Sequence, residues 1–392
     1  MAEPLRHDRP LGRSLDPLPE ESLGGYLLRL AHRLHLSPIR LARLTGCTKQ
    51  PSTTQLGRTL LLGLDVVGFA RATRLSEAEV AALTLVPWAD RYPPIAHMHS
   101  GTGARASRDD WLFNNIPRYC PQCLAGDGTL GQQQFGGPWK KVWQLPIAFA
   151  CPGHRVFLHH GCPRSHPSDR AITQLITQAA DSSLHPTQCR HPDQPGSRGR
   201  KGPSCGVRLD QRNDADTPRP SESMLKTQQR LLDLLEPHRP AKDAVTQFTD
   251  LRVVTALLCA SWPHGRDLID PSPSAAVNDH IRALGSGARQ VLDRPPTDPT
   301  ATAALLTAAA TLLDASDLND TLAKHVRATW EGRPSRAPWT RIFARHGSSC
   351  SEVLQQAAEP ATHAYRRRSG PHSPKAPVRA DGYLPEHVPA FL

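Results

Sequence analysis

The sequence lacks any segment that would carry the chain into or across a membrane. Its first ten residues, MAEPLRHDRP, contain no apolar core of the kind that a secretory signal needs. No run approaches the roughly 18 to 20 consecutive apolar residues that cross a bilayer. The most tempting stretch, residues 300–313, consists mostly of Ala and Thr. We therefore expect a cytoplasmic protein with no membrane partner.

Aromatic residues are also scarce, at 5% of 392 residues, whereas the chain has 27 glycines and 38 prolines. Such a composition favours short elements, many turns and some unstructured connections. The length is enough for two or three domains. The nine cysteines are an odd number in a chain without an export signal. Metal ligation is therefore a better expectation for them than a disulfide framework.

The chain also lacks the motifs of common enzymes: it has no nucleophile elbow, no phosphate-binding loop and no paired catalytic carboxylates. We therefore expect no enzymatic activity and no catalytic residue. The formal net charge is +11, which suits a polyanionic partner such as nucleic acid or an acidic protein face. A genome rich in G and C, which favours Arg, Ala and Pro, explains the same charge equally well.

One stretch, residues 118–154, specifies a chemistry. It reads RYCPQC, then WKKVWQLP, then CPGH. Cys120 and Cys123 form one pair with a two-residue spacer, and Cys151 and His154 form a second pair of the same shape. Such a spacer lets both ligands reach one ion, and zinc takes four ligands in a tetrahedron. Because the protein fills all four positions and no HExxH motif stands nearby, we predict a closed structural zinc site.

A second and less regular set of ligand types follows directly. Cys162 begins CPRSHP, in which Ser165 occupies the expected place of a second cysteine and His166 is the nearest substitute. The candidate ligands of a second zinc are Cys162, His166, Cys189 and Cys205. His191 could replace His166. The alternative is a degraded site whose remaining cysteines are buried or idle.

Helical patterns precede this region. Residues 1–15 are expected to form a mobile arm, and residues 16–90 a set of short helices joined by tight turns. Their starts are marked by Ser22 as an N-cap and by Ser76 with Glu79 as a capping box. Short helices of this kind in a basic chain resemble a helix-turn-helix unit. The candidate DNA-facing residues are Arg40, Arg43, Arg71 and Arg74. A small helical bundle with arginines on its surface fits the same pattern.

Helical patterns also follow the metal-ligand region. We assign residues 91–210 to the zinc-finger region, 221–330 to a helical bundle, and 331–392 to a short helix and a basic, proline-rich tail. The predicted fold class is therefore mostly α with a small zinc-ribbon or zinc-finger centre. Helices like those of a helix-turn-helix unit precede the zinc knuckles, and a helical bundle follows them.

Several of these motifs resemble the TniQ family, the target-selection proteins of transposons. The motifs are LDPLPEESLGGYLLRLA near the start, RYCPQCL and WKKVWQLPIAFACPGHRVFL in the centre, and SCGVRL after them. The resemblance implies Cys120, Cys123, Cys151 and His154 as the ligands of a first zinc finger. For the second finger it implies Cys162, Cys189 and Cys205, whereas Ser165 departs from the family pattern.

The resemblance also implies a function. Members of the family are non-enzymatic adaptors that recognise a target, either a DNA site or an RNA-guided CRISPR effector complex. They then recruit an AAA+ ATPase, which in turn recruits the transposase. We therefore expect DNA and an AAA+ transposition ATPase as partners, and we also consider a homodimer. The alternative function is that of a stand-alone, zinc-dependent DNA-binding regulator without a transposase partner.

Overall fold

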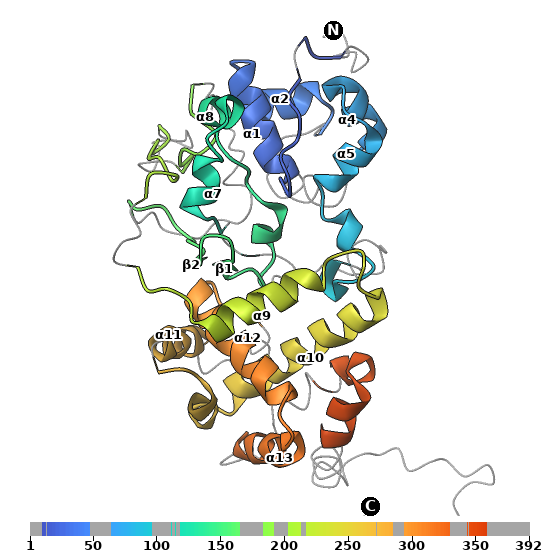
Figure 1. Ribbon diagram of the computed structural model, residues 1–392, viewed down its shortest axis with the longest axis vertical. Helices are drawn as coiled ribbons and strands as arrows, with labels where there is room; N and C mark the ends of the chain where they lie inside the picture. Colours follow the sequence, from blue (N-terminus) through green and yellow to red (C-terminus); the bar gives the residue numbers. More distant parts are fainter. Residues whose placement is uncertain are drawn as a thin grey trace, which may run out of the picture.

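The chain folds as a mostly helical protein, as the sequence predicts. The computed structural model describes residues 10–12, 14–47, 64–95, 111, 114, 118–164, 183–191, 203–212, 217–271, 273–284, 294–329, 343 and 345–358. Within these residues the helices form two groups at opposite ends of the molecule (Figure 1). A region of short elements that contains the Cys and His pairs lies between the two groups. Most of the predicted arm and all of the predicted tail lie outside the described residues.

The N-terminal group begins where the sequence indicates. Its elements are α1 (Leu23–Arg33), α2 (Pro38–Leu44), α4 (Val66–Thr73), α5 (Glu77–Ala82) and the 3-10 helix η1 (Val86–Trp88). The hydroxyl of Ser22 accepts a hydrogen bond from the Gly25 amide at the start of α1. Ser76 and Glu79 form the complete capping box of α5. Local side-chain chemistry therefore fixes two helix starts, and both are confirmed.

The core of this group is built on α1. Tyr26, Leu27 and Leu30 are fully buried on it, and the ring of Tyr26 meets that of Phe69 on α4 edge to face at 6.2 Å. The main chain beside α1 joins the central region, because the Ser22 amide donates to the carbonyl of Trp139. The N-terminal helices are therefore anchored directly to the region that carries the first metal ligands.

The central region consists of short elements. These are α7 (Pro121–Ala125), α8 (Leu130–Phe135), the 3-10 helix η2 (Lys141–Gln144), and the strands β1 (Ala150–Cys151) and β2 (Val156–Phe157). The strands pair antiparallel, with Ala150 opposite Phe157 and Cys151 opposite Val156. This hairpin presents the turn between its strands toward α7 (Figure 1), which sets the geometry of the site described below.

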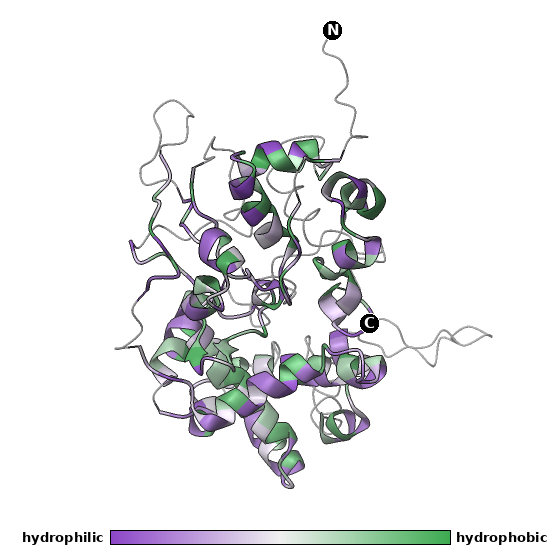
Figure 2. Cartoon of the chain, turned by 45° about the horizontal axis from the view of Figure 1, so that its top comes forward, coloured by the Kyte–Doolittle hydropathy of each residue, from purple (hydrophilic) through white to green (hydrophobic). Residues whose placement is uncertain are grey.

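The C-terminal group surrounds one helix. Its elements are α9 (Glu222–Asp233), α10 (Ala241–Ala260), η5 (His264–Leu268), α11 (Ser274–Leu284), α12 (Pro299–Leu313), α13 (Leu318–Ala328) and η7 (Gly347–Ser349), and residues 352–358 are also helical. Helix α12 is rich in Ala and Leu on all sides, and 11 of its residues are buried. It packs against α9, α10, α11 and α13, as expected of a helix without a polar face. Figure 2 shows hydrophilic and hydrophobic residues alternating on the surrounding helices.

No helix in the described part of the chain is both long and apolar enough to cross a membrane.

Candidate metal centre

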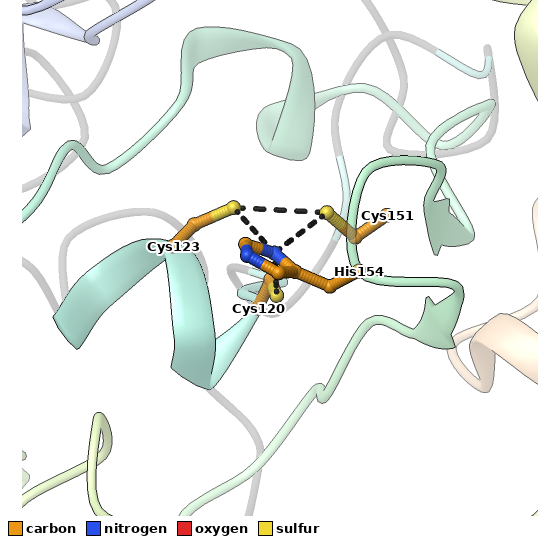
Figure 3. Close-up of side chains that lie close together, drawn as sticks. All are labelled: Cys120, Cys123, Cys151 and His154. Atoms are coloured by element: carbon orange, nitrogen blue, oxygen red, sulfur yellow. Dashed lines mark hydrogen bonds between the residues drawn. The ribbon is translucent and has the colours of Figure 1, made fainter. Parts of the chain in front are cut away.

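Four side chains from two separate segments converge between α7 and the β1–β2 hairpin. Cys120 directly precedes α7, and Cys123 lies within it. Cys151 ends β1, and His154 lies in the turn that leads to β2. Figure 3 shows the four side chains pointing toward one another. Their ligand atoms all lie within 4.8 Å of one another, so the structure brings together the four residues of the predicted first site.

The distances between these atoms fit a tetrahedral ion. The Nδ1 atom of His154 lies 3.4 Å from the sulfur of Cys120, 3.3 Å from that of Cys123 and 3.4 Å from that of Cys151. The sulfurs of Cys123 and Cys151 are 3.6 Å apart. A tetrahedron with zinc–sulfur bonds of about 2.3 Å and a zinc–nitrogen bond of about 2.0 Å has edges of about 3.5 to 3.8 Å. The sulfurs are too far apart for a disulfide, which needs about 2.05 Å.

The charges that the thiols can carry also favour a cation. Contacts with the thiols of Cys120 and Cys151, together with burial, raise the pKa of Cys123. Hydrogen bonds from Cys120 and Cys123 instead lower the pKa of Cys151. One thiolate is therefore stabilised by its neighbours, whereas further ionisation would place like charges side by side. A divalent cation removes that repulsion, and binding it would release protons.

A close approach of the backbone supports this arrangement, and it depends on a glycine that the sequence pattern did not single out. A Cβ atom on Gly137 would lie 2.0 Å from the carbonyl oxygen of Cys123. No side chain fits there, and the Gly137 amide donates to the carbonyl of Leu124 in α7. The segment that follows α8 can therefore pack against the helix that carries Cys123 only because residue 137 is glycine. The sequence feature that could have indicated this close approach is the pair of adjacent glycines at 136 and 137.

Three of the four predicted ligands of the second site also lie together. The ligand atoms of Cys162, Cys189 and Cys205 are within 4.8 Å of one another, and the sulfurs of Cys162 and Cys205 are 3.8 Å apart. A backbone hydrogen bond holds Cys189 beside Cys205, because the amide of Gly206, the residue after Cys205, donates to the carbonyl of Cys189. His166 lies outside the described residues. His191 does not belong to this cluster, as far as the described residues show.

The four predicted DNA-facing residues lie in the N-terminal group. Arg40 and Arg43 are on α2, Arg71 is on α4, and Arg74 ends α4 in the left-handed conformation with a φ of 61°. All four are exposed, so their charges are accessible to a polyanion. Their role in binding DNA stays a prediction.

Comparison with known proteins identifies one region of the chain. The TniQ family model matches residues 13–158, a range that holds the N-terminal helices and all four residues of the first cluster and ends before Cys162. No curated protein and no solved structure matches the chain. TniQ proteins are non-catalytic target-selection adaptors of transposition. Residues 13–158 of this chain therefore form a TniQ domain.

Proposed function

We propose that this protein is a transposition adaptor that recognises a target and recruits an AAA+ transposition ATPase. The observation that carries the proposal is the family match over residues 13–158. The target is either a DNA site or an RNA-guided CRISPR effector complex. The protein contributes binding surfaces and no catalytic step.

Zinc would serve this adaptor as a structural cross-link. Cys120, Cys123, Cys151 and His154 would hold one ion, and three thiolates with one imidazole are a donor set that zinc prefers in closed sites. The ion would join α7 to the β1–β2 hairpin across 27 intervening residues. Because two-residue strands and a five-residue helix form little core by themselves, metal binding would supply much of the local stability.

A second zinc would be held by Cys162, Cys189 and Cys205, with His166 as the proposed fourth ligand. Burial raises the pKa of Cys189, so this thiol would ionise mainly when a cation is present. The separation of 3.8 Å between the sulfurs of Cys162 and Cys205 is the edge expected for two thiolates on one zinc.

The proposed nucleic-acid surface is the N-terminal helical group. Arg40 and Arg43 are separated by three positions, so they share one face of α2. Arginines presented on an exposed helix can contact phosphates, and each such contact contributes to the salt dependence of binding. A helix-turn-helix mode of binding is our proposal for these helices.

Two measurements test the proposal. Fluorescence anisotropy with duplex DNA should show that the double variant Arg40→Ala/Arg43→Ala binds more weakly, with a salt slope reduced by about 1 for each arginine–phosphate pair that the substitutions remove. Arg282→Ala is the matched control, because Arg282 is exposed on α11 and pairs with Asp279. Affinity capture with the AAA+ ATPase of the same transposon should retain the ATPase. Binding to DNA without the ATPase would favour the regulator, and binding to neither would contradict the adaptor.

A further inference from the structure

Two buried side chains form hydrogen bonds with the backbone segment that leads into Cys151. Residues 146–150 form the approach to β1, where consecutive backbone groups need partners because the segment is buried. Arg118 and Gln228 supply five of those hydrogen bonds. One stands two residues before Cys120, and the other is on α9 of the C-terminal group.

Arg118 connects this segment to α12. It is only 1% exposed. Its Nη1 atom donates to the carbonyls of Pro146 and Ala148 at 3.0 and 2.5 Å. Its Nη2 atom donates to the carbonyl of Pro296 at 2.8 Å and to the hydroxyl of Thr302 at 2.9 Å. A single guanidinium therefore holds the approach to Cys151 against the first turn of α12.

Gln228 bonds three further backbone groups of the same segment. Its side chain is fully buried, and its Oε1 atom accepts from the amides of Phe149 and Ala150 at 2.7 and 3.0 Å. Its Nε2 atom donates to the carbonyl of Ile147 at 3.4 Å. The primary amide therefore both accepts from and donates to this one segment. Ala150 immediately precedes Cys151, so α9 fixes the main chain at a candidate metal ligand.

We propose that Arg118 and Gln228 are positioning residues that couple metal binding at the first cluster to the packing of α9 and α12. The proposal rests on the structural metal centre put forward above. The position of the Cys151 sulfur depends on a backbone that Gln228 of the C-terminal group bonds directly and that Arg118 links to α12. A cation that holds that sulfur therefore also favours the packed arrangement of the group, and the effect is reciprocal because binding free energies are linked.

The matched control is available on the same helix. Gln229 follows Gln228 on α9, but it is exposed and its side chain bonds only to Asp233 at 2.9 Å among the contacts described. Gln228→Met keeps the size of the side chain and removes its hydrogen bonds to residues 147–150. Gln229→Met makes the same chemical change without touching that segment.

The experiment uses the full chain with Zn²⁺ as the probe. A chromogenic chelator competes for the metal, and circular dichroism confirms that each variant is folded. Removing a partner of a metal ligand usually costs about 10- to 100-fold in affinity. Gln228 acts one residue away from Cys151, so we expect a smaller loss of about three- to tenfold for Gln228→Met and none for Gln229→Met. If Arg118→Met does not fold, Gln228→Met carries the test together with Gln228→Glu, which keeps an acceptor for the amides of Phe149 and Ala150.

Hydrogen exchange separates coupling from simple loss of stability. In the wild type, Zn²⁺ should slow exchange in α12 as well as at Cys151. A merely structural role for Gln228 would lower protection of α12 equally with and without zinc, whereas loss of coupling reduces the zinc-dependent difference itself. If the wild type binds zinc but α12 shows no zinc-dependent protection, or if Gln228→Met retains it in full, the coupling is refuted. If the wild type binds no zinc, the proposed metal centre fails instead.

Discussion

Replacing Cys123 by serine tests whether the cost of losing a cysteine depends on its burial or on its role as a metal ligand. Cys123 is only half-buried, whereas Cys259 on α10 is 4% exposed and lies outside both clusters. Burial alone ranks Cys259→Ser as the costlier change, at about 1–3 kcal/mol for a hydroxyl placed among apolar groups. Structural zinc contributes about 10–16 kcal/mol to the folding of small zinc domains. Losing one of four ligands should therefore cost several kcal/mol and reverse that order.

Denaturant unfolding of both variants, with and without a chelator, provides the measurement. The chelator should destabilise the wild type and Cys259→Ser but add little to the damage in Cys123→Ser, because that variant has already lost its tight site. Of the three proteins, only Cys123→Ser should contain less zinc per chain than the wild type in metal analysis. If Cys123→Ser costs less free energy than Cys259→Ser and the chelator affects none of the proteins, the first cluster is not a structural metal site.

Three further changes test particular contacts. Gly137→Ala should cost about 1–3 kcal/mol of unfolding free energy, since its Cβ would lie 2.0 Å from the Cys123 carbonyl oxygen, whereas Gly153→Ala, with open space around the added methyl, should be tolerated. Ser76→Ala should cost about 1 kcal/mol by removing the capping box of α5, a loss that denaturant unfolding detects. Burial lowers the pKa of His280 from 6.5 to about 4, so the folded protein resists a proton that the unfolded chain accepts. Stability is then full above pH 6.5 and lost as the pH falls toward 4. His280→Leu should remove this pH-dependent loss, which is about 3 kcal/mol, and thermal melts across this pH range measure it.

The parts of the fold that the sequence predicts are those determined by neighbours along the chain. Ser22 and Ser76 cap helices because their hydroxyls reach amides three residues away. The two ligand pairs of the first cluster are recognisable because each spans only two intervening residues. Cys120 is the N-cap residue of α7, so a short helix follows the first residue of one expected knuckle.

The parts that the sequence does not predict depend on contacts between distant residues. Gln228 carries no local signal, because its partners at Phe149 and Ala150 are 79 and 78 residues away. Arg118 reaches Thr302 across 184 residues. A run of basic and polar residues gives no indication of which arginine is buried, and only the packed structure separates Arg118 from the exposed arginines of α2.

The family match ends at Leu158, but the interactions of the matched region do not. A fragment of residues 13–158 contains all four residues of the first cluster, yet it lacks Gln228 and the acceptors that Arg118 finds at Pro296 and Thr302. The amides of Phe149 and Ala150 would then need water as their partner, beside a Phe149 side chain that is fully buried in the whole chain. We therefore expect the fragment to bind zinc more weakly than the full chain in the same chelator competition. Equal affinity would show that the first cluster is autonomous and that α9 and α12 only cover it.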